Sequence, residues 1–279
     1  MKKNTTLATH YIKNENVIGF SAEDYSKFKF GKSDIGNKFG NDLFQKLITS
    51  KKVELNDYKK IVIFSSPYDF IPTATQTIFL SFFNSLSDYF KDSIKIEKNK
   101  IHRNTTYTDD YGNLSKEDRM KLISNDSFEI ENNFDGTELL IFLDDIKITG
   151  SHEFVVKKTL KEKQIVNDVM FLYHALLINN EIDPTFENYL NYKYVKNVSQ
   201  LVEIHNSSDF AINTRFTKFI LQLNESDFNY FTENVNDESL KKIAFNAFGN
   251  KYDKIPKYIG NLKKIINLAK IEFIKHLNL

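Results

Sequence analysis

The residues of this chain best suited to chemistry are two adjacent carboxylates, Asp144 and Asp145, and the Thr-Gly-Ser turn at residues 149–151. An apolar run at residues 139–143 precedes the acids and predicts a buried strand that ends at them. Residues 152–163 contain no proline or glycine and predict a helix that begins directly after the turn. Adjacent carboxylates can bind a diol or a metal ion, and N–H groups at a helix start can bind a phosphate. The spacing therefore predicts a sugar-phosphate site at the carboxyl edge of an open α/β sheet.

A strand ending in two acids has two other interpretations. It could be the Walker B strand of a nucleoside triphosphatase, and the chain does contain Gly31-Lys32-Ser33. A phosphate loop needs a further glycine five residues before Gly31, however, and Ser26 stands there, which argues against this class. The acids could also be purely structural and cap a neighbouring helix. The turn at 149–151 favours a ribose-phosphate site, because a hydrogen bond to a charged group contributes about 1.5–3 kcal/mol.

Composition narrows the class of protein. The 279 residues are 41% apolar, which suffices for one large α/β domain or for one domain with a smaller helical one. The absence of cysteine excludes disulfides and thiolate zinc sites. Because 38 basic residues balance 37 acidic ones, net charge does not indicate a nucleic-acid or membrane partner. With neither a spanning apolar run nor a signal peptide, we expect a cytoplasmic protein.

Hydrophobic periodicity predicts alternating helices and strands in the first two thirds of the chain. Helices are expected at residues 33–50, capped by Ser33, and at 73–91; strands are expected at 61–64, 93–103, 127–130 and 166–178. This alternation between residues 60 and 178 predicts a parallel sheet. His174, on the last of these strands, is expected to be a core histidine.

The remaining segments differ in character. Residues 104–125 are polar and lack a core pattern, which is typical of a lid or binding loop. Beyond Pro184, helical patterns occur at residues 186–195, 214–223, 238–248 and 257–277. We therefore expect an α/β domain at 1–183 and an all-helical C-terminal extension at 184–279.

Residues 139–151 resemble the 5-phosphoribosyl-1-pyrophosphate (PRPP) signature of type I phosphoribosyltransferases, which consists of an apolar strand, two acids, three residues and Thr-Gly-Ser. Upstream, Leu114-Ser115, Asp118-Arg119 and Phe128 are similar to the ComF-like, competence-protein branch of that family, as is the run Phe28-Lys29-Phe30-Gly31. The resemblance covers roughly residues 25–180.

The resemblance implies an open parallel sheet flanked by helices, and it implies a role for each matching residue. Asp144 and Asp145 would bind the ribose hydroxyls of PRPP, directly or through Mg²⁺. The phosphate loop would comprise Lys147, Ile148, Thr149, Gly150 and Ser151. The pyrophosphate loop would comprise Ser65, Ser66, Pro67, Tyr68 and Asp69, and Arg103 or Arg119 would contact pyrophosphate from the catalytic loop at 104–125.

The chain departs from the family pattern in three places. Ile148 stands where purine-salvage members carry an acid, which argues against a 6-oxopurine acceptor. The pyrophosphate-loop position has no glycine and carries Tyr68 and Phe70, and the Arg-Gly-Phe-Asn run of ComF proteins is absent. The resemblance therefore implies a phosphoribosyltransferase with an unknown acceptor. The alternative is a non-catalytic PRPP- or nucleotide-sensing protein of DNA uptake, stress response or phage defence, contacting a protein partner through its C-terminal helices.

Overall fold

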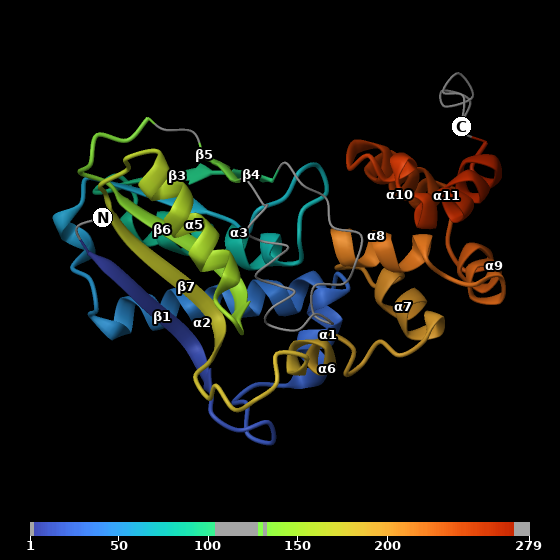
Figure 1. The fold of residues 1–279 in the computed structure, drawn as a ribbon, viewed down its shortest axis with the longest axis horizontal. Coiled ribbons are helices and arrows are strands. Elements are labelled where there is room, and N and C mark those ends of the chain that lie inside the picture. Colours follow the sequence, from blue (N-terminus) through green and yellow to red (C-terminus); the bar gives the residue numbers. More distant parts are fainter. Residues whose placement is uncertain (1–2, 104–127, 131–132, 271–279) are drawn as a thin grey trace.

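A five-stranded parallel sheet forms the centre of the computed structural model, which describes residues 3–103, 128–130 and 133–270. The strand order is β1 (Asn4–Ile12), β7 (Asp168–Leu177), β6 (Leu139–Lys147), β2 (Lys60–Phe64) and β3 (Lys95–Asn99). Figure 1 labels β1, β7, β6 and β3 of this sheet. Every neighbouring pair in this sheet is parallel. The predicted α/β fold with an open parallel sheet is confirmed, and β3 lies at one edge of the sheet.

Helices cover both faces of the sheet. One face packs on α1 (Ala22–Lys29), α2 (Ser33–Ser50) and α3 (Thr75–Phe90); the other packs on α5 (Ser151–Glu162) and on a ribbon of β4 (Ile101–Arg103) and β5 (Phe128–Ile130). Each face of the sheet has its own hydrophobic core, and alternate residues of β6 belong to one or the other. Leu139, Ile141 and Leu143 lie in the core with α1, α2 and α3, whereas Leu140 and Phe142 lie in the core with α5. Burial on both faces explains why this strand is a continuous apolar run.

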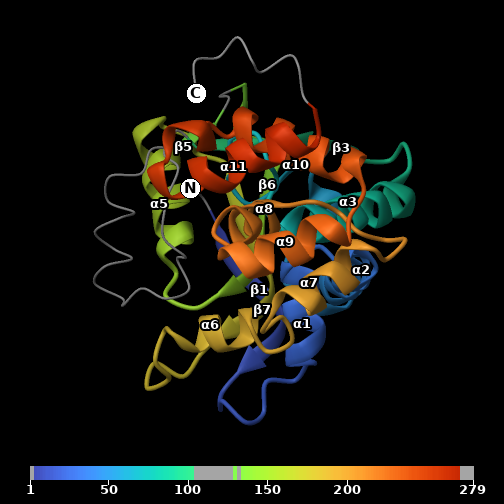
Figure 2. The same ribbon diagram turned by 90° about the vertical axis from the view of Figure 1, so that its right-hand side faces the viewer.

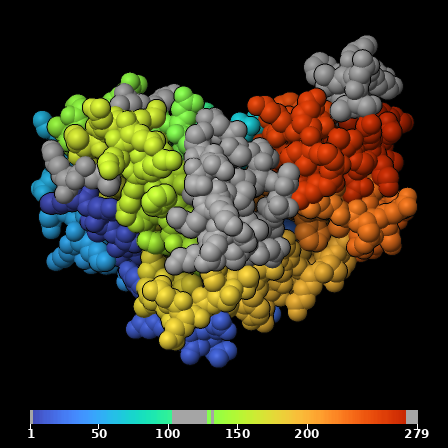
Figure 3. Space-filling model, in the orientation of Figure 1, coloured from blue at the N-terminus to red at the C-terminus, as the bar shows by residue number. Residues whose placement is uncertain are grey.

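The C-terminal third is helical and has its own core. Its helices are α6 (Phe186–Asn191), α7 (Val198–His205), α8 (Thr214–Leu221), α9 (Glu225–Glu233), α10 (Asp237–Gly249) and α11 (Pro256–Leu268), seen face-on in Figure 2. The core of α7–α11 also contains Phe30 and Ile71 from the α/β part. In the space-filling view, the segments from α6 to α11, yellow to red, run along the lower and right-hand sides (Figure 3).

Asparagine explains part of this helical region. Asn197, Asn213, Asn224 and Asn236 each cap the following helix through a side-chain oxygen that accepts a hydrogen bond from a backbone N–H in the first turn. The four predicted helical patterns begin within one residue of α6, α8, α10 and α11, and α7 and α9 are additional. The division into domains at residues 183 and 184 stays a prediction.

Several local predictions are wrong. Strand β6 does not end at the acids but continues to Lys147, which pairs with Leu176 of β7. Helix α2 begins at Ser33 with Lys32 at the cap position, and the Ser33 hydroxyl donates to the Asp209 carbonyl instead. The expected strand at 93–103 consists of β3 and β4, and the latter pairs antiparallel with β5. Strand β1 and helix α1 were not predicted.

The segment at 104–125 lies outside the described residues. None of the helices within the described ranges is both long and apolar enough to cross a bilayer.

Candidate active site

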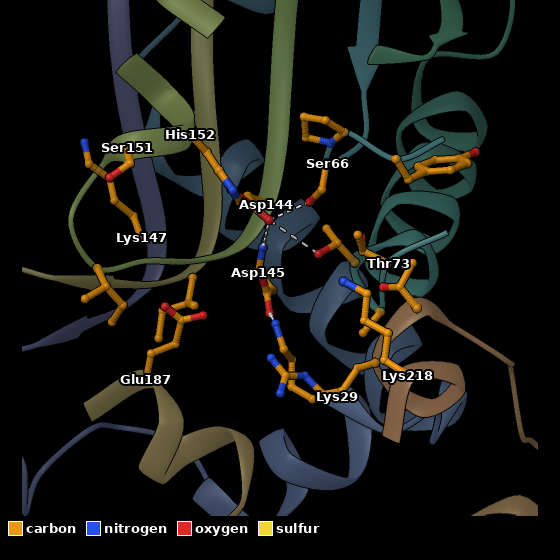
Figure 4. A pocket seen from close by; sticks show the side chains of 18 of the residues that line it. Lys29, Ser66, Thr73, Asp144, Asp145, Lys147, Ser151, His152, Glu187 and Lys218 are labelled. Carbon is orange, nitrogen blue, oxygen red and sulfur yellow. Dashed lines mark hydrogen bonds and ion pairs between the residues drawn. The ribbon is translucent and has the colours of Figure 1, made fainter. Parts of the chain in front are cut away.

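A cavity of about 460 Å³ opens at the carboxyl ends of β2 and β6, between the sheet and the helical region. Its sheet side comprises the loop after β2, the end of β6 and the start of α5, and α1, α6 and α8 lie opposite (Figure 4). The chain at residues 250–252 completes the lining. The sheet side includes the acids and phosphate-loop residues predicted from sequence, Asp144, Asp145, Lys147, Ile148, Thr149, Gly150 and Ser151. This volume is within the range of small-molecule sites.

Asp144 is held by side chains from three elements. Its Oδ1 accepts hydrogen bonds from the Ser66 hydroxyl at 2.5 Å and the Thr75 hydroxyl at 3.4 Å, and His152 Nδ1 lies 3.1 Å from Oδ2. Burial alone would raise the pKa of Asp144, but the hydrogen bonds and positive charge around it hold that pKa well below its usual range. Asp144 is therefore a fixed carboxylate over the whole physiological pH range.

Asp145 is bound by helix α1. Its Oδ2 accepts a hydrogen bond from the Tyr25 hydroxyl at 2.8 Å and forms an ion pair with the Lys29 ammonium. Tyr25 and Lys29 are one helical turn apart, so both reach the same carboxylate. Burial raises the pKa of Asp145; the Lys29 ammonium offsets part of that rise, while Asp144 adds to it.

The two acids do not form a ready-made metal cage. Because β6 continues past them, Asp144 faces Ser66 and His152 on one side of the sheet, and Asp145 faces Tyr25 and Lys29 on the other. Within the described ranges, no group of three histidine or acidic side chains could hold a metal ion. Each carboxylate is already engaged by a nitrogen of the protein. A resident magnesium ion does not fit this donor set, and the predicted magnesium remains a prediction.

The turn before α5 has the features of a phosphate site. Gly150 adopts φ 76° at the cap position and provides no capping side chain, while the hydroxyls of Thr149 and Ser151 lie 2.6 Å apart. The first N–H groups of a helix have no intrahelical acceptors, and its dipole favours an anion there. A Cβ on residue 150 would lie 3.1 Å from Lys147 Cε, so glycine also keeps the loop close to that side chain.

Lys147 supports this turn through a buried acid. Its ammonium donates to Glu153 at 2.7 Å, and Glu153 also accepts from the Tyr173 hydroxyl at 2.9 Å and pairs with Lys157. Burial would raise the pKa of Glu153, but these partners lower it overall, so the acid stays ionised. The predicted phosphate-loop residue Lys147 thus also fixes the first turn of α5 against β6 and β7.

The loop after β2 lines the cavity with Ser66, Pro67, Tyr68 and Asp69, but not with Ser65. The Tyr68 N–H donates to the Ile101 carbonyl at 3.4 Å, and Lys100 donates to the Asp69 carbonyl at 2.5 Å. This part of the loop is therefore tied to the chain at the start of β4.

The same loop is also tied to the helical region. Asn250, which follows α10, accepts hydrogen bonds from the N–H groups of Phe70 at 2.9 Å and Ile71 at 2.6 Å. The two bonds fix the position of α10 relative to the carboxyl end of β2.

The two arginines predicted to contact pyrophosphate have no described side chains, so this assignment stays a prediction. Arg103 ends β4, where its backbone pairs with Phe128, and nothing is described of its side chain. Arg119 lies outside the described residues.

The helical side of the cavity was not predicted from the sequence. Its additional lining residues include Lys29, Thr75, Glu187, Tyr192, Arg215, Lys218, Phe219 and Gln222. The spacing of Arg215, Lys218, Phe219 and Gln222 (i, i+3, i+4, i+7) is a signal that could have placed them on one helix face. Nothing in the sequence indicates that this face lines the same cavity as Asp144 and Asp145, because the two segments are about 70 residues apart.

Comparison with known proteins extends the similarity over almost the whole chain. A family model described as PRTase ComF-like, where PRTase denotes phosphoribosyltransferase, matches residues 3–265. The match includes the helical region, well beyond the 25–180 span covered by the sequence resemblance. No curated protein matches the chain.

Proposed function

Because this chain belongs to the ComF-like family of phosphoribosyltransferases, we propose that it binds PRPP and transfers the phosphoribosyl group to an acceptor with release of pyrophosphate. The observation that supports this proposal is the convergence of Asp144, Asp145 and the turn at 149–151 on one cavity. Carboxylates can bind the hydroxyls of a ribose 5-phosphate, and the N–H groups at a helix start can bind its phosphate. Here the carboxylates lie near the carboxyl end of β6, and the helix start is that of α5, which follows β6 directly.

In the proposed complex, the ribose hydroxyls donate hydrogen bonds to Asp144 and Asp145, and the 5′-phosphate accepts from the first turn of α5. Rigid support of each acid by neighbouring side chains keeps them in place without reorganisation when the ligand binds.

In the transfer step the bond from C1′ to the pyrophosphate oxygen breaks, and its electron pair leaves with pyrophosphate. A lone pair of the acceptor forms the new bond to C1′, and the acceptor releases its proton to solvent. The two carboxylates favour the positive charge that develops on the ribose ring.

Magnesium enters this proposal as part of the substrate. Pyrophosphate carries oxygen ligands that suit Mg²⁺, which commonly retains several waters and binds through phosphates. When Mg²⁺ binds through the phosphates of PRPP, Asp144 can keep its contact with His152, and Asp145 can keep its ion pair with Lys29. The acceptor remains unassigned, and Ile148, which lines the cavity with an apolar side chain, offers no acid to a 6-oxopurine.

Calorimetric titration tests the binding step. We expect the wild-type protein to bind both ribose 5-phosphate and PRPP, and Asp145→Asn to weaken both by at least about 10-fold, since a charge-assisted hydrogen bond is lost. The matched control is Asp88→Asn, an exposed position near the end of α3 remote from the cavity, which should leave both affinities unchanged. Absence of binding by the wild type, or equal effects of the two substitutions, contradicts the proposal.

Pyrophosphate release tests the transfer step. With PRPP and Mg²⁺ present, release of pyrophosphate should depend on adding an acceptor from a panel of pyrimidines, purines and other nitrogen heterocycles. Binding without acceptor-dependent release across such a panel would contradict transfer and support the PRPP-sensing alternative.

A further inference from the structure

Helix α8 presents one face to the cavity and buries the other. Arg215, Lys218 and Phe219 line the cavity, and Gln222 continues the same row just after the helix. The opposite side chains, Phe216, Thr217, Ile220 and Leu221, are at most 1% exposed in the core of the helical region. Packing of the buried side fixes the rotation of α8 about its axis. The Cα–Cβ bonds of its two cations are therefore directed toward the cavity.

Hydrogen bonds join α8 to the loop after β2. The N–H of Thr214, the first residue of α8, donates to the Pro72 carbonyl at 3.0 Å. With the two bonds that Asn250 accepts from Phe70 and Ile71, this makes three attachments between the helical region and this loop. The cationic face of α8 is therefore fixed beside the loop that, by its place in the sheet, would receive the pyrophosphate of PRPP.

The backbone of this loop is poorly suited to hold pyrophosphate by itself. Pro67 has no N–H, the Tyr68 N–H is bonded to Ile101, and the N–H groups of Phe70 and Ile71 are bonded to Asn250. The loop contains no glycine, so side chains limit the approach of a ligand to its backbone.

Helix α8 contributes two cations to the cavity lining, Arg215 and Lys218. The acids at the sheet edge have nitrogen partners on the sheet, α1 and α5: His152 for Asp144, Lys29 for Asp145, and Lys147 and Lys157 for Glu153. The cations of α8 therefore add positive charge on the side of the cavity opposite these pairs, where a polyanion such as pyrophosphate would be attracted.

Both cations of α8 have an aromatic neighbour in the cavity lining. The Arg215 guanidinium lies 5.6 Å from the Tyr192 ring centroid, and its Nη1 is 3.4 Å from the Tyr192 hydroxyl. Figure 4 shows Lys218 extending from α8 into the cavity, toward Thr73 and the end of β6 that carries Asp144. Its ammonium lies 5.9 Å from the ring centroid of Tyr252, whose hydroxyl accepts a hydrogen bond from Asn250, the residue bonded to the loop after β2.

We propose that Lys218 and Arg215 of α8 bind the pyrophosphate of PRPP, so that the helical region adds positive charge to a leaving-group site where three backbone N–H groups of the loop are already bonded. This inference rests on the proposed function. In it, the two cations neutralise the negative charge that accumulates on pyrophosphate as the C1′–O bond breaks. In this arrangement, the three hydrogen bonds between the helical region and the loop after β2 hold the two cations beside the pyrophosphate.

Equilibrium binding of two separate probes tests this assignment. We expect Lys218→Gln to weaken the binding of inorganic pyrophosphate by about 10- to 100-fold, and that of ribose 5-phosphate by less than about 2-fold. Arg215→Gln should act in the same direction, and Lys218→Arg, which keeps the charge, should retain most of the pyrophosphate affinity. Lys241→Gln, an exposed position on α10, is the matched control and should change neither affinity.

The outcomes separate this inference from the proposed function. If the wild type fails to bind ribose 5-phosphate, the proposed function itself is wrong. If ribose 5-phosphate binds normally but Lys218→Gln leaves pyrophosphate affinity unchanged, only the assignment of α8 is overturned. A loss confined to ribose 5-phosphate would place these cations at the 5′-phosphate and would also overturn it. Equal loss of both probes in Lys218→Gln and in Lys218→Arg would show a structural role and contradict the assignment.

Discussion

The Lys29 ammonium and the Asp145 carboxylate form an ion pair between α1 and β6, across 116 positions of the sequence. Both side chains are largely buried, with 13% and 7% exposed. A buried ion pair gains little net stability over an apolar pair, but removal of one partner leaves an uncompensated charge. The ion pair also positions the Asp145 carboxylate at the cavity. The placement of this carboxylate therefore depends on the packing of α1.

A double-mutant cycle on this pair should show strong coupling. Lys29→Met leaves the Asp145 carboxylate buried without its cation and should lower the free energy of unfolding by about 3 kcal/mol. Asp145→Asn should also destabilise, but the double variant should lose clearly less than the sum, because neither residue then carries a buried charge. Urea denaturation of the four proteins measures the cycle, and additive losses would show that the two charges do not interact.

The acid pair and its turn illustrate what local sequence can predict. Strand, acids, turn and helix are contiguous at residues 139–162, so spacing alone indicates their order and their place at a sheet edge. The end of the strand was nevertheless misplaced, because Asp144 to Lys147 pair with β7, and such pairing depends on a distant segment. This error matters, since the extra strand residues place the two carboxylates on opposite faces.

The partners of the acids could not be predicted for the same reason. Tyr25 and Lys29 reach Asp145 from a helix that has only eight residues and weak apolar periodicity. Strand β1 was missed because it is an edge strand in which Leu7, Ala8 and Ile12 are buried among polar residues. The contribution of α8 was missed because helix periodicity indicates which residues share a face, but not what that face meets.

Gly150 should be intolerant of a side chain. Alanine at this position would have to adopt φ 76°, which costs an L-residue about 1–2 kcal/mol, and its Cβ would crowd Lys147 Cε at 3.1 Å. We expect Gly150→Ala to lower the free energy of unfolding by about 1 kcal/mol and to weaken ribose 5-phosphate binding. Thermal denaturation and calorimetric titration measure the two effects.

Gly260 provides the control for this substitution. It lies within α11, where a Cβ would meet no atom within 4 Å. Gly260→Ala should therefore stabilise the protein by about 0.5–1 kcal/mol and leave the ligand affinity unchanged. Equal responses at the two glycines would argue against a special backbone conformation before α5.

His174 should make stability dependent on pH. Its ring is fully buried, stacks on Phe39 at 3.7 Å, and has no hydrogen-bond partner for either nitrogen among the described residues. Burial, with smaller effects of His10 and Lys38, lowers the pKa of His174 to about 3.

The sign of the effect follows from proton binding. The unfolded chain protonates His174 near the usual pKa of about 6.5, whereas the folded chain does so only near the lowered value. Stability from neutral His174 is thus present above about pH 6.5 and is lost as pH falls from there toward 3. Relative to His174→Phe, the wild type should lose about 2 kcal/mol between pH 6.5 and pH 4.5. Parallel pH profiles of the two proteins in urea denaturation would show that His174 does not titrate in this way.

Asn250 should be essential to the attachment of the helical region. Its side-chain oxygen accepts two hydrogen bonds, from Phe70 at 2.9 Å and Ile71 at 2.6 Å, and the residue is only 4% exposed. Asn250→Ala would leave two N–H groups without this acceptor, at about 1–3 kcal/mol for each buried group. We expect a loss of about 2–4 kcal/mol in the free energy of unfolding, and faster amide exchange at Phe70 and Ile71.

Asn250→Asp separates hydrogen bonding from packing. Its carboxylate keeps an oxygen that can accept from both N–H groups, and it can accept from the Tyr252 hydroxyl in place of the bond that the Asn250 amide donates there at 3.1 Å. Because the buried carboxylate costs stability of its own at this 4% exposed position, the expected difference lies in amide exchange, which should stay slow at Phe70 and Ile71 in Asn250→Asp and become fast in Asn250→Ala. If both amides exchange as fast in Asn250→Asp as in Asn250→Ala, the contribution of Asn250 does not come from its acceptor oxygen. Because this oxygen holds the loop after β2 against the helical region, Asn250→Ala should also weaken pyrophosphate binding, whereas Asn250→Asp should preserve most of it.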